Sequence, residues 1–348
     1  MRRAGRSART LAAGGLFILA SSLCAAQQPA MERARMAALA DRLLDSMAGH
    51  DAAKAPLASE YAATENGQPA ALPMMVLWRT ASSVDHRYYI IDPTTQQILL
   101  IARAREGDLD TLLFGRLKLS GNTLSEIELY ADRSRGNGGF MFDGSGPAHL
   151  PDAWTRAITA QQRATRAQLQ QEARSIFDPS VPATAGGEGC MLMENGRIVG
   201  ENPEVLKHIM EGVDVAKLPH LEDGSVAIPC GASPERPTDQ QARSDLIDEE
   251  RSIAVSIAVV HGMVEPYLAT TPTVSAYVPF AMLKPYASML AGQQASGKFS
   301  AVPALKPMEG SILVVEIHRI FDGKLQGMMM LQNIAPIGAG TPWVQNHP

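Results

Sequence analysis

The chain has 348 residues, with 31 Lys and Arg against 36 Asp and Glu, which gives a formal net charge of −5. That length suits two domains of ordinary size, each large enough to bury a core. Because no run of Lys and Arg follows the first ten residues, nucleic acid and anionic membrane surfaces are poor candidates as partners.

Residues 1–26 are typical of a secretory signal peptide. Four arginines within the first nine residues precede the short apolar run Leu11–Leu23, and the small residues Cys24-Ala25-Ala26 follow it. Cleavage is therefore expected near Ala26, and the apolar run is too short to span a membrane as a mature helix. The alternative is a lipoprotein with a lipidated Cys24, but a Leu stands directly before it where a small residue is expected.

Cleavage would change the charge and the location of the protein. It removes four arginines and no acidic residue, so Lys and Arg fall from 31 to 27 against 36 Asp and Glu, and the net charge becomes about −9. The rest of the sequence has no apolar run long enough to span a membrane. The mature protein is expected to be soluble and exported, to the periplasm or the extracellular space.

The remaining sequence contains one pattern twice. The motif TENGQ near Thr64 and the motif MENGR near Met193 each follow a helical stretch. After each motif comes a strand segment, Ile90–Gly107 or Leu246–Gly262, and then a hairpin. A repeated order of helix, ENG loop, strand and hairpin predicts two copies of one small α+β unit.

The first unit is predicted over residues 31–135. Apolar residues recur at helical spacing over residues 31–47, which predicts an amphipathic helix. Ile98–Arg105 is predicted as a strand, and Leu112–Leu119 and Leu124–Tyr130 as a hairpin joined by a Ser-Gly-Asn turn. Alternating apolar and charged residues predict one buried and one mostly solvated face for this hairpin.

A Gly- and Pro-rich linker, residues 136–152, leads to the second unit, which is predicted over residues 153–345. Apolar positions from Trp154 to Phe177 predict one long helix at its start. The final hairpin turns at Asp322-Gly323, which supplies the positive φ angles of a tight turn. Because its strands lack a solvated side, this hairpin is expected to be covered on both faces.

Cys190 and Cys230 are the only cysteines left after cleavage, an even pair in an oxidising compartment. They are predicted to form a disulfide, worth roughly 4 kcal/mol in the chain-entropy model. It would clamp residues 200–245, an insertion with no counterpart in the first unit and with one predicted helix, Pro203–Val215. Neither cysteine has a second ligand at zinc-site spacing, so no metal is expected there.

A comparison of the two hairpins singles out an acid and a histidine. Aligned at an offset of 201 residues, Glu316 falls opposite Gly115 and His318 opposite Leu117. Residues i and i+2 of a strand project to the same side, so these two groups can share a cavity. Such a pair suits a general base, because the acid orients the imidazole and raises its pKa. The alternative is a structural pair inside a core or a repeat interface.

Other candidates are less specific. His261 ends the predicted strand Ile253–Val260 and could meet His318 if their strands are neighbours, and Tyr277 could line a pocket. Asp248–Arg251 is predicted as a turn or helix cap with local ion pairs. No Gly-x-Ser-x-Gly elbow, phosphate loop or dinucleotide fingerprint is present, so no cofactor is expected. The histidine spacings do not indicate a metal site.

The segment VEIHRIFDGKLQGMMMLQN resembles the closing hairpin of SnoaL-like proteins in the nuclear-transport-factor-2-like (NTF2-like) superfamily. The acid, Arg and Asp-Gly-Lys of that motif correspond to Glu316, Arg319 and Asp322-Gly323-Lys324. The ENG loop, the DEER segment and the tail Pro336–Trp343 are similar to those of secreted fungal and bacterial proteins built from such units. The resemblance covers most of residues 31–345 and implies two tandem cones of curved antiparallel sheet, each wrapped by helices, with a pocket at the mouth.

Enzymes of this superfamily often have an Asp at the end of the last strand. The matching positions here are Asp132 in the first unit and Asn333 in the second. The unit with the Glu–His pair thus lacks the acid, and Asn333 becomes a candidate binding residue.

Two functions remain open. The first is a cofactor-free isomerase, dehydratase or lyase that acts on a small, partly apolar molecule, with His318 as base or acid and Glu316 orienting it. The second is a non-catalytic ligand-binding or assembly module, for which a homodimer is one form. A cavity at His318 would favour the enzyme, whereas close packing by Met side chains would favour the module.

Overall fold

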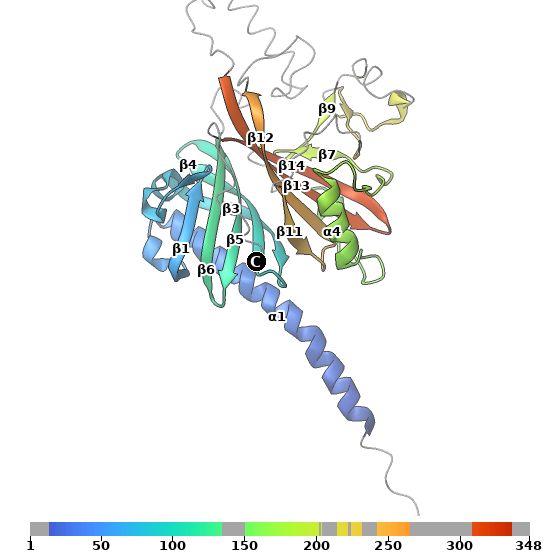
Figure 1. The fold of residues 1–348 in the computed structure, drawn as a ribbon, viewed down its shortest axis with the longest axis horizontal. Coiled ribbons are helices and arrows are strands. Elements are labelled where there is room, and N and C mark those ends of the chain that lie inside the picture. The colour runs from blue at the N-terminus through green and yellow to red at the C-terminus, as the bar shows by residue number, and fades with distance from the viewer. Residues whose placement is uncertain are drawn as a thin grey trace, which may run out of the picture.

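A computed structural model describes residues 14–133, 150–201, 203, 214–221, 224–231, 242–264 and 308–335. This part of the chain contains two curved six-stranded sheets and few helices, so the predicted α+β class is confirmed (Figure 1). The two sheets pack against each other, with α1 on the outer face of the first sheet and α4 on the outer face of the second.

The first sheet has the strand order β2-β1-β6-β5-β4-β3. Its neighbouring strands are antiparallel except β1 and β6, which are parallel. The strands are β1 (Leu57–Glu65), β2 (Gln68–Pro69), β3 (Ala81–Asp92), β4 (Gln97–Glu106), β5 (Leu109–Ser120) and β6 (Thr123–Arg133). The helical elements are α1 (Gly14–Ala48), α2 (Val76–Thr80) and the single turns η1 (Ala52–Lys54) and η2 (Leu72–Met74). The predicted strand and hairpin are therefore confirmed, with ends one to three residues further out.

The second sheet has the order β11-β12-β13-β14-β7-β8, with β7 and β14 parallel and the other neighbours antiparallel. Its strands are β7 (Leu192–Glu194), β8 (Arg197–Ile198), β11 (Arg243–Asp248), β12 (Ile253–Val264), β13 (Met308–Phe321) and β14 (Lys324–Ala335). A separate pair joins β9 (Gly200–Glu201) to β10 (Val226–Ala227). The helical elements are α3 (Asp152–Thr155), α4 (Arg166–Ser175) and the turn η4 (Val215–Lys217).

The two ENG turns make equivalent contacts in their sheets. Asn66 and Asn195 both have left-handed backbone, with φ of 50° and 45°. The Asn66 side chain accepts from the backbone N–H of Ala131, and the Asn195 side chain accepts from that of Gln332, each at 2.8 Å. The two donor residues, Ala131 on β6 and Gln332 on β14, are 201 residues apart, the same offset that aligns the hairpins in sequence.

The helix α1 packs as its sequence periodicity predicts. Met36, Leu39, Leu43, Leu44 and Met47 are all buried in one core with the outer face of the first sheet. Burial of each such side chain contributes about 1.5–3 kcal/mol, so this face holds the helix to the sheet. The helix begins at Gly14 and runs without a break through the expected cleavage site. The cleavage itself stays a prediction.

The inner faces of the two sheets form a second core. It combines Phe114 and Tyr130 of the first sheet with residues such as Val315 and Ile317 of the second. The prediction of a mostly solvated face for the first hairpin is therefore wrong. That face is covered by the second sheet, and even Arg116 on it is only 6% exposed. The final hairpin is covered on both faces, as predicted.

The two units also exchange equivalent ion pairs. Asp92, at the end of β3, accepts from Arg166 of α4 at 2.7 and 3.1 Å. Asp248, at the end of β11, accepts from Arg33 of α1 at two distances of 2.8 Å. Each carboxylate also accepts, at 3.0 Å, from the backbone N–H of the residue before the other Asp. The prediction of local ion pairs at Asp248 is thus wrong, because the main partner of Asp248 is Arg33 of the other unit.

The predicted long helix from Trp154 to Phe177 is also wrong. It consists of α3 and α4, with a non-helical stretch between them. A capping box starts α4, since Thr165 Oγ1 accepts from the backbone N–H of Gln168 and the Gln168 side chain accepts from that of Thr165. Buried Arg319 donates to the carbonyls of Ala153 and Arg156, each at 2.7 Å, and so holds the residues after α3 out of the helix.

The disulfide between Cys190 and Cys230 is confirmed, with the two Cα atoms 5.4 Å apart. It ties the segment before β7 to the segment after β10. Most of the predicted helix Pro203–Val215 lies outside the described residues. The domain boundaries derived from sequence stay predictions.

Within the described part of the chain, no helix is both long enough and apolar enough to cross a membrane.

Candidate functional site

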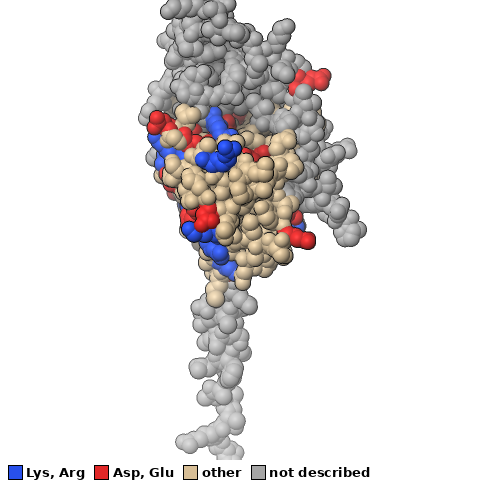
Figure 2. Space-filling view, turned by 90° about the vertical axis from the view of Figure 1, so that its left-hand side faces the viewer, with Lys and Arg blue, Asp and Glu red and all other residues tan. Residues whose placement is uncertain are grey.

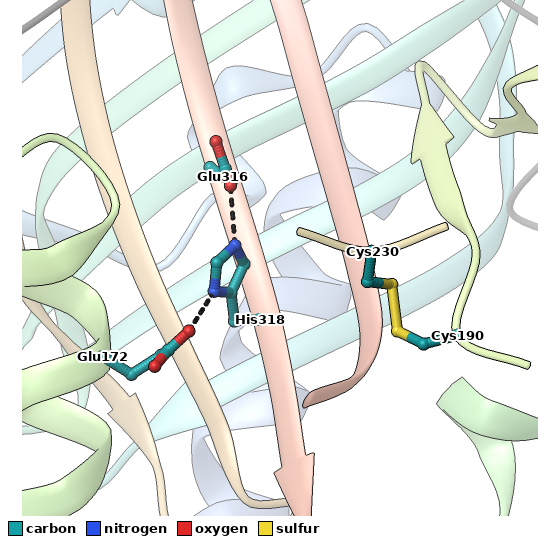
Figure 3. The surroundings of a disulfide bond; sticks show 5 residues. All are labelled: Glu172, Cys190, Cys230, Glu316 and His318. Carbon is teal, nitrogen blue, oxygen red and sulfur yellow. Dashed lines mark hydrogen bonds and ion pairs between the residues drawn. A yellow bond between two sulfur atoms is a disulfide. The ribbon is translucent and has the colours of Figure 1, made fainter. Parts of the chain in front are cut away.

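Glu316 and His318 lie two residues apart on β13, on the face that α4 covers (Figure 3). The neighbours of His318 on the adjacent strands, Ala254 and Met328, belong to the core shared with α4. The Nε2 atom of His318 lies 2.6 Å from Oε1 of Glu316, and both residues are buried. The two side chains therefore share one face and contact each other, while a catalytic role for them stays a prediction.

Glu172 of α4 completes a buried triad. Its Oε1 atom lies 2.6 Å from Nδ1 of His318, so the imidazole is held between two carboxylates (Figure 3). Its Oε2 atom accepts from the backbone N–H of Thr184 at 2.8 Å. The sequence reasoning missed Glu172 because a polar residue on a helix is usually solvated. The signal was a comparison of the two helices, in which Arg166 and Ala173 match Arg33 and Ala40, so that Glu172 matches the buried Leu39.

The equivalent positions of the first unit cannot hold such a triad. Leu39 and Leu117 are buried in an apolar core. Gly115 lies so close to β6 that an added Cβ would come 2.1 Å from the carbonyl oxygen of Glu128. The triad of Glu172, Glu316 and His318 is therefore a property of the second unit alone.

The geometry of the triad favours a charged imidazole. With a carboxylate at each ring nitrogen, both nitrogens can donate only if His318 is an imidazolium. Burial opposes that charge, but the hydrogen bonds to Glu172 and Glu316 outweigh it and raise the pKa of His318 above its usual value. Burial likewise opposes the ionised form of Glu172, but hydrogen bonding to His318 and Thr184 lowers the pKa of that carboxyl.

These two shifts predict a pH window for the stabilisation that the triad provides. A raised pKa of His318 gives stability that is complete below the usual value of 6.5 and is lost as the pH rises through the folded-state pKa. A lowered pKa of Glu172 gives stability that is complete above 4.5 and is lost as the pH falls through its folded-state pKa. We therefore expect the triad to contribute most between about pH 4.5 and 6.5.

This expectation can be checked by urea unfolding of the wild-type protein and of a variant with an apolar triad (Glu172→Leu, Glu316→Met, His318→Leu) across that range. The unfolding free energy of the wild type relative to that of the variant should be highest inside the window and should decrease on either side of it. A difference that is constant with pH would contradict the assigned charges.

A pocket of about 370 Å³ lies beside the triad, between the start of α4 and the turn that joins β13 to β14. Glu172 forms part of its wall, whereas His318 and Glu316 do not reach it. Most of its other lining residues are polar, namely Gln161, Gln162, Arg163, Gln168, Gln171, Thr184 and Asp322. The pocket thus has many amide groups that can donate or accept hydrogen bonds, and two carboxylate residues, of which Glu172 is buried and Asp322 accepts from Gln162.

The structure does not bring the other predicted site residues to the triad. His261 lies on β12 opposite Ser311, whose Oγ is 2.7 Å from its Nδ1, and it is exposed. Seven residues of strand, roughly 23 Å, separate Ser311 from His318, so the expected contact between the two histidines is wrong. Asn333 is buried on the opposite, inter-sheet side of the second sheet, paired with Leu313. Tyr277 lies outside the described residues.

Asp132, the acid at the end of the last strand of the first unit, faces the second unit. Its Oδ2 accepts from the side-chain amide of Asn195 at 3.3 Å, and it is buried. No three His, Cys, Asp or Glu side chains of the described residues converge on a point where a metal ion could bind.

Comparison with known proteins adds little. No protein-family model matches the sequence, and no curated protein matches it. Among solved structures, part of the chain is similar in shape to a protein from Kribbella flavida described as a candidate ketosteroid isomerase. The identity is 13%, the TM-score is 0.24, and the match covers 28% of this chain and 77% of that one. A likeness this small carries no functional assignment.

Proposed function

We propose that this chain is an exported small-molecule-binding protein whose ligand site is the pocket beside Glu172 in the second unit. The observation that carries the proposal is the position of Glu172. The residue lines the pocket, and its buried carboxylate is held by both His318 and the backbone of Thr184. A wall residue fixed in this way gives a ligand a preformed surface, without the entropy cost of ordering a free side chain.

The pocket has the size and the chemistry of a binding site. Its volume of about 370 Å³ is within the range of small-molecule sites. Its apolar lining, which includes Ile320, alternates with amide groups, so the fitting ligand is small, partly apolar and rich in hydrogen-bonding groups. Export is supported by the basic and apolar leader and by the disulfide of Cys190 and Cys230.

Binding ranks ahead of catalysis because of the state of the two titratable groups. Both ring nitrogens of His318 are engaged by carboxylates and the ring is 3% exposed, so it has no free nitrogen to act on a substrate. The lowered pKa of Glu172 makes that carboxylate a weak base. The triad is therefore better suited to brace α4 against the sheet and to fix the pocket wall.

A cofactor-free isomerase or lyase is the second candidate, and one observation favours it. Glu172 is the triad member at the pocket, so it would touch the substrate as acid or base. His318 would then be a positioning residue that exchanges charge with Glu172, and Glu316 would orient the imidazole. This assignment differs from the sequence hypothesis, in which His318 itself meets the substrate.

A pair of neighbouring substitutions on α4 tests the binding site. Gln171 lines the pocket and Gln170 does not, and both are exposed. Gln171→Trp should fill the pocket and weaken ligand binding about tenfold or more, whereas Gln170→Trp should leave it unchanged. The measurement is mass spectrometry of the small molecules that the purified protein retains from a metabolite extract. Equal retention by both variants and the wild type would refute the site.

The same extract separates the two candidates. Incubation with wild-type protein should leave the composition of the extract unchanged apart from the bound molecule. A product that forms with wild type and not with Glu172→Gln, at a temperature at which circular dichroism shows both proteins to be folded, would replace the binding proposal with the enzyme.

A further inference from the structure

The first unit has a hollow of its own. It measures about 360 Å³ and lies between α2 and the two-residue turn that joins β4 to β5. Its lining includes Glu106, Thr111 and Arg133. Each of them lies two positions along its strand from a buried residue of the first core, namely Ala104, Leu113 and Ala131, and so on the same face of the sheet. The hollow therefore continues the face of the sheet on which the first core lies.

The rim of this hollow is apolar and open to solvent. Val76 on α2 is 46% exposed and Leu109 at the start of β5 is 40% exposed, and both line it. They are two of the four large apolar side chains that are exposed among the residues whose side chains are described, which in the first unit start at Ala30. Figure 2 looks onto the side of the molecule that lies on the left of Figure 1, where uncharged residues make up much of the described surface. Exposed apolar side chains that meet around a hollow indicate a binding surface.

The floor of the hollow is formed by the carboxylate of Glu106, which already accepts several hydrogen bonds. Glu106 accepts from the hydroxyls of Thr80 and Thr111 and from two N–H groups of Arg133. Burial alone would raise the pKa of Glu106, but these hydrogen bonds outweigh it and lower the pKa, so the carboxylate stays ionised at neutral pH. The Glu106 oxygens are thus already occupied by protein donors.

Arg133 has one N–H group that is available to a ligand in the hollow. Its Nε and Nη2 atoms bind Glu106, and Nη2 also lies 3.6 Å from Glu65. Its Nη1 group donates to none of the described residues, and the side chain is 32% exposed at the hollow. The charged residues of the lining are one carboxylate, Glu106, and one guanidinium, Arg133, which pair with each other, so the hollow has no net positive charge that would favour an anionic ligand.

We propose that this hollow is a second small-molecule site, specific for a neutral and mainly apolar molecule that carries a carbonyl or hydroxyl oxygen. The oxygen accepts a hydrogen bond from Nη1 of Arg133, and the apolar body lies between Val76 and Leu109. The site belongs to the first unit and is independent of the function proposed for the second.

Titration with prodan, a neutral fluorescent ketone, tests this site in the full chain. Leu109→Lys and Val76→Lys should each weaken prodan binding about tenfold or more, because each adds a charge to the apolar rim. Met74→Lys is the matched control, since Met74 is 74% exposed but does not line the hollow. That variant should bind prodan like the wild type, as should Gln171→Trp, which fills the pocket of the second unit.

Three results would overturn the proposal. They are unchanged binding in both rim variants, loss of binding in Gln171→Trp, and tighter binding of the anionic probe anilinonaphthalene sulfonate than of prodan. Because the rim residues are exposed, thermal unfolding of the rim variants should match that of the wild type, so a loss of binding cannot be attributed to misfolding. Failure of this test leaves the Gln171 experiment on the second unit unaffected.

Discussion

Replacement of His318 by alanine is expected to lower the free energy of unfolding by about 3–5 kcal/mol. The substitution removes the imidazolium between Glu172 and Glu316 and leaves two carboxylates in the interior without that counter-charge. It also removes the polar contact between α4 and β13, which is made by Glu172 and His318, and leaves only the apolar packing between these elements. Equilibrium unfolding in urea at pH 6 measures the effect.

The apolar triad variant is the control for this experiment. Replacing Glu172, Glu316 and His318 together by Leu, Met and Leu should cost little or stabilise the protein, because apolar groups of similar volume need no desolvation. The first unit, with Leu39 and Leu117 at two of the equivalent positions, already shows that this packing is compatible with the fold. A loss below about 1 kcal/mol in His318→Ala would show that the triad is not an ion-paired brace.

Replacement of Asp248 by alanine is expected to cost a similar 3–5 kcal/mol, for a different reason. The change removes the bidentate acceptor of Arg33 and the acceptor of a buried backbone N–H in the other unit. Asp92→Ala should behave alike through Arg166. Because each carboxylate binds the backbone directly before the other, we expect the double variant to deviate from the sum of the two changes.

Calorimetry shows whether these carboxylates couple the two units. The wild type should unfold in one transition, whereas the Asp92→Ala, Asp248→Ala double variant should show two, one for each unit. Asp108→Ala, at an exposed turn of the first unit, should change the stability by no more than about 0.5 kcal/mol. A single sharp transition in the double variant would mean that the apolar core between the sheets couples the units by itself.

Elements defined by local periodicity could be predicted from the sequence. The spacing of Met36, Leu39 and Leu43 on α1, the Asp-Gly turn of the final hairpin and the offset that aligns the hairpins all depend on residues near each other in the chain. The pairing of Cys190 with Cys230 followed because no other cysteine remains after the expected cleavage.

Features that depend on the packing of one unit on the other could not be predicted in this way. Phe114 and Arg116 alternate with apolar residues as a solvated face would, but the second sheet covers them. Asp248 has charged neighbours in sequence, yet its main partner is Arg33, 215 residues away. Periodicity within one strand or turn contains no information about a partner that distant in sequence.

Two of the three residues of the triad could be predicted from the sequence. Glu316 and His318 stand out because they share a strand face, whereas Glu172 lies on a helix that periodicity alone merged with α3. The break between these helices depends on the capping box of Thr165 and on buried Arg319, which binds the carbonyls of Ala153 and Arg156, more than 160 residues away. If Glu172 is overlooked, His318 has one ring nitrogen without a partner and is interpreted as a general base. Glu172 binds that nitrogen, and this contradicts the interpretation.

The protonation state of His318 tests the central claim most directly. Nitrogen NMR of the wild-type protein labelled at histidine, titrated from pH 5 to 9, reports both ring nitrogens, with His318→Gln to assign the signal. We expect two protonated ring nitrogens at pH 6.5 and a titration midpoint above the usual value of 6.5. A His318 signal with one unprotonated ring nitrogen at pH 6.5, or a titration midpoint at or below 6.5, would contradict a charged imidazole between two carboxylates. His318 would then again be a candidate general base.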